Sequence, residues 1–247
     1  MMRPLFKWAA RGLLCCASAL VLIGTGTEAW AGSFTVSPVR IELSPQRPLG
    51  SLTITNDGTE PVTIDAKAMV WTQQSGEDRH EDTRELIVTP PVFTLEPRAS
   101  QVVRIGLRRP PDRERELAYR VFLTENAPPP TAATTGVAMT LRLSVPIFIR
   151  PVAAPVARLD WSASLVSPDE LRLQAVNVGN LHVQVADLRL SSGGQLAGQM
   201  STPAYVLPGQ TRAWTVKLAK PLQPDVSPIQ LEGFSDAGDV KVSVPLR

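Results

Sequence analysis

The sequence has few of the residues that usually build a catalytic or redox site. Its 247 residues include two cysteines, two histidines and only 5% aromatic residues. It also lacks the G-x-S-x-G, G-x-x-x-x-G-K-[ST] and H-E-x-x-H patterns of common hydrolases, phosphate-binding loops and zinc proteases. This inventory argues against an enzyme, and we expect no cofactor.

The two histidines do not indicate a metal site. His80 lies in the charged segment of residues 77–82, where one imidazole among mobile carboxylates offers no fixed coordination geometry. We therefore expect a solvated turn at this point. His182 alternates with Leu181 and Val183 and is predicted to lie on the surface of a strand. The sequence predicts no bound metal.

The first 31 residues have the pattern of a secretory signal peptide. Arg3, Lys7 and Arg11 precede an apolar run over residues 13–23, and residues 29–31 (Ala-Trp-Ala) form a small-x-small cleavage site. An apolar run of this length is shorter than the roughly 18 to 20 residues that a membrane-spanning helix needs. The pattern predicts cleavage after Ala31, export, and no stable membrane insertion.

The mature chain from Gly32 has no excess of charge of either sign. The leader holds three of the 25 Lys and Arg residues and one of the 23 Asp and Glu residues, so 22 of each sign remain. A neutral chain with scattered basic residues has no electrostatic footprint for nucleic acid. Because both cysteines leave with the leader, the stability of the mature protein must come from packing.

Short runs of alternating apolar and polar residues dominate the mature chain and predict an all-β fold. Turn formers separate the runs, and no segment of ten or more residues shows a helical period. The predicted strands cover residues 34–43 (interrupted at Pro38), 52–54, 62–70, 86–95, 101–107, 117–124, 137–150, 159–165, 171–178, 182–190, 204–207, 212–218, 229–234 and 240–244. Their spacing is typical of antiparallel sandwiches.

A proline-stiffened, small-residue segment divides these strands into two groups. Residues 151–157 read Pro-Val-Ala-Ala-Pro-Val-Ala, which is typical of a short linker. The predicted domains are therefore residues 32–151 and 152–247.

The strand predicted over residues 137–150 is unusually long. Apolar residues occupy every second position: Val137, Met139, Leu141, Leu143, Val145, Ile147 and Ile149. At about 3.3 Å per residue the segment spans about 46 Å, more than twice the common strand length. It is either a core strand with a long tail, or a strand whose apolar row serves another chain at a sheet edge.

The predicted first domain contains three specific motifs: Thr-Pro-Pro (89–91), Leu-Glu-Pro (95–97) and Phe-Ile-Arg-Pro (148–151). Together with residues 37–43, 102–105 and 119–125, these motifs resemble the signature segments of periplasmic pilus-assembly chaperones. The resemblance implies two immunoglobulin-like domains in a boomerang arrangement. It also implies a periplasmic, ATP-independent protein that binds pilin subunits, has no small-molecule substrate, and delivers the subunits to an outer-membrane usher.

The resemblance also implies roles for individual residues. In this family the last strand of the first domain lends apolar side chains to a pilin that lacks a strand, and Val137, Met139, Leu141 and Leu143 match those donor positions. A cleft arginine holds the terminal carboxylate of the pilin, and Arg40 matches it. Three further residues, Glu116, Arg150 and Asp236, match an ion network between the two domains.

One departure from the family pattern concerns the carboxylate anchor. Pro146 replaces the second basic residue of the cleft and supplies neither charge nor a backbone donor, so Arg142 or Arg104 is a candidate for a displaced anchor. The proline also predicts a bulge or an unpaired edge. Together with the short connection over residues 127–136, it resembles the branch of archaic, spore-coat-U-associated pili.

An exported adhesive or carbohydrate-binding protein is the alternative from another class. Such a protein should present clustered exposed aromatic residues. In this chain Trp71, Trp161 and Trp214 are widely spaced in the sequence, which favours the chaperone.

Overall fold

The structure is a computed structural model that describes residues 34–126, 140–222 and 228–246. The predicted leader and its cleavage site lie outside the described residues. Within the described ranges the chain forms eighteen strands and no helix, as the alternation predicted, so no helix there is long and apolar enough to cross a membrane. The described residues belong to one compact unit.

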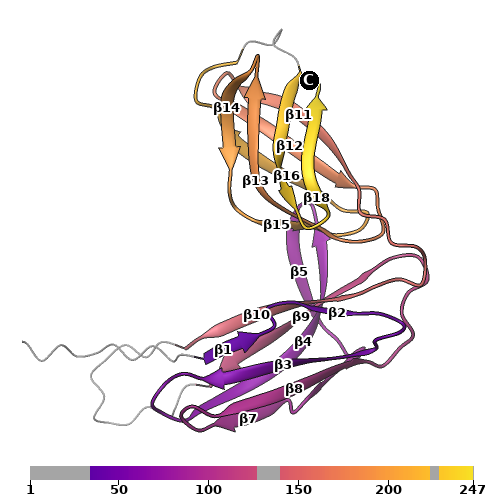
Figure 1. Cartoon of the computed structure of the whole chain (residues 1–247), viewed down its shortest axis with the longest axis vertical. Helices are drawn as coiled ribbons and strands as arrows, with labels where there is room; N and C mark the ends of the chain where they lie inside the picture. Colours follow the sequence, from indigo (N-terminus) through magenta and orange to yellow (C-terminus); the bar gives the residue numbers. More distant parts are fainter. Residues whose placement is uncertain (1–33, 127–139, 223–227, 247) are drawn as a thin grey trace, which may run out of the picture. The chain divides into compact units, whose positions relative to one another are not determined.

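Two sheets built from the first ten strands face each other around one core, and we call this pair the first sandwich (Figure 1). The four-stranded sheet has the order β1 (Phe34–Ser37), β3 (Leu49–Asn56), β8 (Ser100–Leu107) and β6 (Leu86–Thr89). The six-stranded sheet has the order β2 (Ile41–Leu43), β10 (Arg142–Ile149), β9 (Leu117–Glu125), β4 (Val62–Gln74) and β5 (Glu77–Asp82), with β7 (Val92–Leu95) also paired to β4.

Two segments that the sequence presents as single strands each divide between the two sheets. β1 and β2 separate around Pro38, and β6 and β7 separate at Pro90 and Pro91. The Ser37–Pro38 and Thr89–Pro90 peptide bonds are both cis. Proline has no N–H for a ladder, so the chain leaves one sheet at these residues and resumes pairing in the other.

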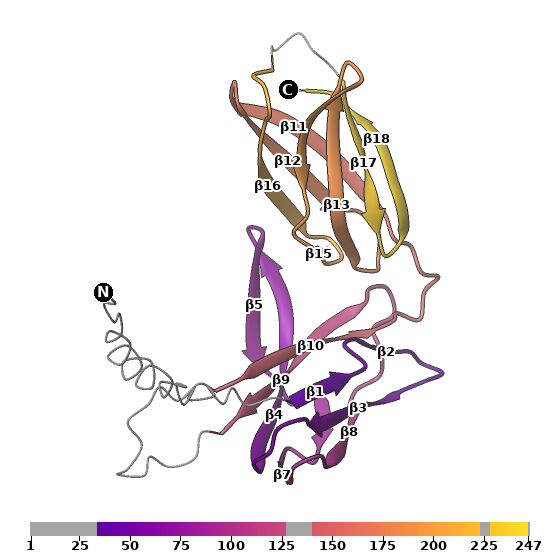
Figure 2. The same ribbon diagram turned by 60° about the vertical axis from the view of Figure 1, so that its left-hand side comes forward.

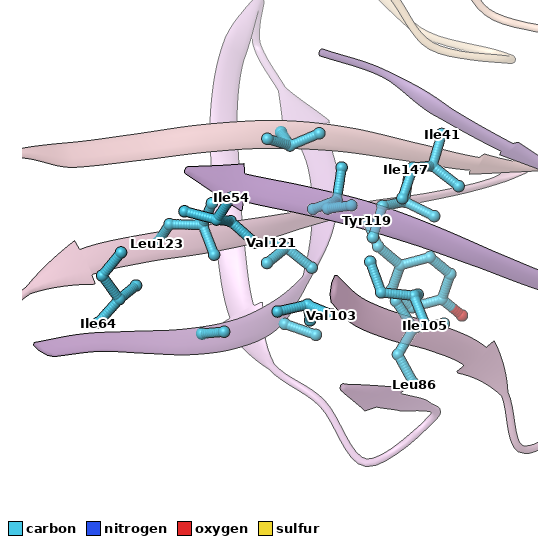
Figure 3. Packing of buried hydrophobic residues seen from close by; sticks show 14 of the residues in the cluster. Ile41, Ile54, Ile64, Leu86, Val103, Ile105, Tyr119, Val121, Leu123 and Ile147 are labelled. Atoms are coloured by element: carbon cyan, nitrogen blue, oxygen red, sulfur yellow. The ribbon is translucent and has the colours of Figure 1, made fainter. Parts of the chain in front are cut away.

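The core of the first sandwich contains the alternating apolar residues of both sheets. Figure 3 shows Ile54, Val103 and Ile105 of one sheet pointing toward Val121 and Leu123 of the other. All five side chains are fully buried. Alternation therefore identified the core-facing residues correctly, because one face of each strand meets the opposite sheet.

The last eight strands form the second sandwich around a separate core (Figure 2). One sheet has the order β11 (Leu159–Ser167), β12 (Glu170–Asn177) and β16 (Thr211–Lys217). The other has the order β14 (Gln195–Met200), β13 (Val183–Ser192), β17 (Ile229–Ser235) and β18 (Gly238–Val244), with β15 (Ala204–Val206) also paired to β13. Sequence reasoning missed β5 and β14, because the first is almost wholly charged and the second is rich in small and polar residues.

A buried asparagine occurs at an equivalent place in each sandwich. Asn56 and Asn177 each accept a hydrogen bond from the backbone N–H two residues on, at 2.9 Å. Each amide also donates to the carbonyl four residues on and to a carbonyl of a more distant strand, at 2.7 to 3.0 Å. Both side chains are at most 2% exposed. The repeated motif supports our division of the chain into two related sandwiches, whose exact domain limits stay a prediction.

Asn56→Ala and Asn177→Ala are each expected to lower the free energy of unfolding by about 2 kcal/mol or more. Each substitution leaves buried backbone groups without partners, at about 1 to 3 kcal/mol per group. Asn126→Ala is the matched control, because its side chain is exposed. Urea unfolding of the three variants measures the effect, and equal stabilities of all three would contradict the structural role of the motif.

Candidate functional site

β10 forms part of the edge of the six-stranded sheet. It pairs antiparallel with β9 along its whole length, but with the parallel strand β2 only from Ile147 to Ile149. On the side away from β9, residues 142–146 therefore have no strand partner within the described parts of the chain. The sequence predicted a bulge or an unpaired edge at Pro146. The register continues through the Pro146–Arg120 pair without a shift, so the structure has the unpaired edge and no bulge at this residue.

The side chains of β10 change character along the strand. Leu141, just before the strand, and Leu143 are partly buried against the core of the first sandwich. From Val145 to Ile149 every residue is buried, so strict alternation of exposure ends there. Val137 and Met139, the other two predicted donor residues, lie outside the described residues. Leu141 and Leu143 are thus the described apolar residues beside the unpaired edge.

Residues of the second sandwich cover the other face of β10. Phe148 packs with Trp71 of β4 and with Leu207 and Tyr205 of the second sandwich. Its ring also stacks on His182, with ring centroids 3.5 Å apart and an interplanar angle of 11°. Gln73 of β4 adds hydrogen bonds to the backbone at residues 205 and 207.

The prediction that His182 lies on the surface was therefore wrong, because the residue is only 9% exposed. The alternation did place His182 away from the core of its own sandwich. The alternation of residues around His182 could not show that residues of the first sandwich cover this side chain.

His182 lies between two carboxylates. Its Nδ1 is 2.7 Å from Oε1 of Glu116 and its Nε2 is 3.2 Å from Oδ2 of Asp236. The backbone N–H of His182 also donates to the same Glu116 oxygen at 2.9 Å. Burial by itself lowers the pKa of His182, but the hydrogen bonds to Asp236 and Glu116 outweigh it, and the pKa is raised. For Asp236, burial raises the pKa and the hydrogen bond to His182 opposes it, and the net pKa is lowered.

A second set of ion pairs extends this group to Arg150. Nη1 of Arg40 lies 2.9 Å from Oδ2 of Asp236, and Nη2 of Arg40 lies 3.5 Å from Glu42. Glu42 then pairs with Arg150 at 2.8 Å. We call the six residues Glu116, His182, Asp236, Arg40, Glu42 and Arg150 the ionic chain.

The ionic chain contains all three residues that the resemblance assigned to an ion network. Among the described residues, however, no ion pair joins two of these three directly. In the described part of the chain Arg150 contacts Glu42, and the link between Glu116 and Asp236 is His182. Sequence reasoning missed His182 and Glu42. Nothing in the sequence next to His182 or Glu42 indicates their ion-pair partners, because these partners are remote in the chain.

The three arginines predicted as carboxylate anchors lie in different places. Arg40 lies in the bend between β1 and β2 and not on a strand, and its guanidinium already contacts Asp236 and Glu42. Arg104 lies on β8 of the other sheet and is exposed. Arg142 begins β10 at the unpaired edge, with its guanidinium 4.3 Å above the ring of Phe122. The structure therefore favours Arg142 over Arg104 as a residue near the edge.

No group of three or more metal-ligating side chains occurs among the described residues. His80 lies on β5, and its ring contacts Trp71 and Phe122. It is half-buried within a regular hairpin, so the expected solvated turn was wrong for this residue.

The sheets and cores define an all-β chain of two sandwiches with a partly unpaired edge strand. Residues 33–155 match the family described as "Pili and flagellar-assembly chaperone, PapD N-terminal domain". This match, which covers the whole first sandwich, places the chain among the pilus-assembly chaperones. No curated protein sequence is similar enough to count as a match.

Solved structures of such chaperones share the fold. A chain of the CsuC–CsuE chaperone–tip adhesion subunit complex of the archaic Csu pili of Acinetobacter baumannii has a TM-score of 0.64 and 18% identity, over 87% of this chain and 100% of that one. A chain of the Salmonella enterica SafA pilin–SafB chaperone complex has a TM-score of 0.59 and 17% identity, over 88% and 98%. The Escherichia coli chaperone DraB has a TM-score of 0.56 and 20% identity, over 87% and 97%.

Proposed function

We propose that this chaperone acts in the periplasm, captures a pilin subunit by donor-strand complementation at β10, and delivers it to an outer-membrane usher. The observation that carries the proposal is the unpaired edge of β10 over residues 142–146, with Leu141 and Leu143 half-buried beside it. A sandwich that lacks one strand exposes an apolar groove and unpaired backbone groups. An edge strand with apolar side chains at every second position satisfies both.

The solved relatives support a pilin-type partner, since two of them are complexes of a chaperone with a tip adhesion subunit or a pilin. Likeness to the archaic Csu system and the replacement of the second cleft base by Pro146 together support assignment to the archaic branch. Arg40 remains a proposed carboxylate anchor, but a ligand there competes with Asp236 and Glu42 for the guanidinium.

The arrangement of the tryptophans supports the chaperone over a carbohydrate-binding protein. Trp71 is buried. Trp161 and Trp214 stack on each other with centroids 5.9 Å apart and pack against the core of the second sandwich. None of the three described tryptophans is exposed as a flat platform for a sugar ring.

Leu141→Glu and Leu143→Glu are expected to reduce capture of a pilin subunit co-expressed with the chaperone by at least about tenfold. A carboxylate has no partner inside an apolar groove, and its burial there is costly. Thr140→Glu should have little effect, because Thr140 is exposed. Co-purification from the periplasm measures capture, and thermal unfolding measures the stability of each free variant.

A core variant separates capture from stability. Val103→Ala lies on the other sheet at a fully buried position, so it should lower stability and leave capture intact. If the two Glu variants behave like Val103→Ala and lose stability but not capture, then the apolar row is ordinary core. In that case strand donation at this edge is wrong.

A further inference from the structure

Residues 150–158, which we call the linker segment, join β10 of the first sandwich to β11 of the second. From Val152 to Arg158 every side chain is exposed. The apolar side chains of Val152 and Val156 are 63% and 49% exposed. Packing of side chains therefore contributes little to holding this segment in place. Hydrogen bonds of its backbone are left to fix its path.

The first sandwich holds the beginning of the linker segment. The N–H groups of Val152 and Ala153 donate to the carbonyls of Asp112 and Arg113, at 3.1 and 2.9 Å. Asp112 lies in the loop between β8 and β9, and its Oδ1 accepts hydrogen bonds from the backbone N–H groups two and three residues on, at 2.8 and 2.9 Å. Such a side-chain bond orders the loop locally. The segment is thus tied to an ordered loop of the first sandwich.

Asn180 of the second sandwich holds the other half of the linker segment. This residue lies in the turn between β12 and β13. Its Oδ1 accepts a hydrogen bond from the N–H of Val156 at 2.7 Å, and its Nδ2 donates to the carbonyl of Ala154 at 3.0 Å. Its backbone N–H also donates to the carbonyl of Val156 at 2.8 Å. Asn180 therefore makes three hydrogen bonds to the backbone of the segment.

Asn180 is bonded to the first sandwich as well. Its carbonyl accepts a hydrogen bond from the N–H of Glu116 at 3.0 Å, directly before β9. The carboxylate of Glu116 in turn contacts the backbone N–H and the Nδ1 of His182, at 2.9 and 2.7 Å. Asn180 is thus a residue at which the linker segment and both sandwiches meet.

Gly179 allows the linker segment to approach this turn closely. A Cβ at position 179 would collide with the carbonyl oxygen of Val156 and lie 2.9 Å from the nitrogen of Arg158. Both are backbone atoms, so rotation about a side-chain bond cannot move them aside. A residue without a side chain is therefore needed here for Asn180 to reach the segment.

We infer that Gly179 and Asn180 form a lock that ties the linker segment to the second sandwich and thereby fixes the orientation of the two sandwiches. The lock keeps Leu207 and His182 over Phe148, so the outer face of β10 stays covered. The ion pairs of Arg40 and Arg150 are partly exposed, and such pairs contribute little to holding two surfaces together. The lock acts in the free chaperone, whether or not a pilin binds.

The distance between two nitroxide labels, measured by pulsed electron paramagnetic resonance, tests the lock. The chain from Gly32 onward has no cysteine, so labels attach only to cysteines introduced at two exposed residues, Thr53 of β3 and Gln199 of β14. With the lock intact we expect one narrow distance distribution. Asn180→Ala removes two hydrogen bonds and Gly179→Ala displaces the linker segment. Each should broaden the distribution at least about twofold, because domains move relative to each other unless an interface holds them.

Two variants that lower stability without touching the linker segment are the matched controls. Asn56→Ala breaks the buried asparagine motif of the first sandwich. Gly233→Ala places a Cβ 2.6 Å from the carbonyl oxygen of Asp187, within the second sandwich. Both should keep the narrow distribution. Equal broadening in the controls, or a narrow distribution in both Asn180→Ala and Gly179→Ala, would overturn the lock.

Amide hydrogen exchange tests the hydrogen bond between Val156 and Asn180 directly. The N–H of Val156 should exchange slowly in the unsubstituted protein and at least about tenfold faster in Asn180→Ala. Asn180→Asp keeps an acceptor for this N–H and should restore slow exchange. The N–H of Ala153, which is bonded to the first sandwich, is the internal reference. Fast exchange of Val156 in the unsubstituted protein would mean that the bond does not persist in solution, and it would overturn the lock.

Discussion

Phe148→Ala is expected to lower the free energy of unfolding by about 3 to 5 kcal/mol, the usual cost of truncating a buried phenylalanine to alanine. Phe148 is fully buried, and its ring contacts Trp71, Tyr205 and His182. The substitution removes the ring that the two sandwiches share. Urea unfolding followed by tryptophan fluorescence measures the loss, since Trp71 packs against this ring.

Phe234→Ala is the matched control for that substitution. Phe234 lies on β17 and is 63% exposed, so the same change of side chain should alter stability by less than about 0.5 kcal/mol. If Phe148→Ala is as stable as Phe234→Ala, the cluster of Trp71, Phe148 and Leu207 does not stabilise the folded protein.

Stability is expected to fall as the pH rises above neutrality, because His182 then loses its proton. The pKa of His182 is raised above 6.5 in the folded protein. Its stabilising contribution is therefore fully present below about pH 6.5 and is lost as the pH rises through the higher folded pKa. A neutral imidazole removes the compensating charge beside Glu116 and leaves Asp236 paired with Arg40 alone, in a largely buried site.

His182→Gln is expected to abolish this alkaline loss and to lower stability at pH 6.5 by about 3 kcal/mol or more, the cost of breaking a buried ion pair. Urea unfolding from pH 6.5 to about pH 9 measures both effects. His80→Gln is the control. The pKa of His80 is lowered, mainly by burial, so its titration changes stability below pH 6.5 and not above it. An alkaline loss that persists in His182→Gln would contradict the assignment.

At acid pH the same site has a second limit, set by Asp236. The pKa of Asp236 is lowered from 3.8, so its contribution is present above that pH and is lost as the pH falls through the folded pKa. The raised pKa values of Tyr119 and Tyr205 keep both phenols neutral across the range. The His182–Asp236 pair is thus most stabilising between the two limits.

The sequence by itself determined that the chain is all-β and which side chains enter the two cores. Successive side chains of a strand point to opposite faces of the sheet, which is a local property. The alternation of apolar and polar residues therefore predicts that Ile54, Val103 and Leu123 face inward. Proline at positions 38 and 90 interrupts pairing for an equally local reason. The family resemblance added Glu116, Arg150 and Asp236, whose side chains all belong to the ionic chain.

Only the tertiary structure decided which polar faces are covered and which charges meet. The sequence predicts that the outer face of β10 and the side chain of His182 are both exposed to solvent. In the structure they cover each other, because the rings of Phe148 and His182 stack with their centroids 3.5 Å apart. Arg40 contacts Asp236, which lies 196 residues away in the chain. Charge pairing of this kind depends on distances between strands that are remote in sequence, and these distances arise only when the sheets assemble.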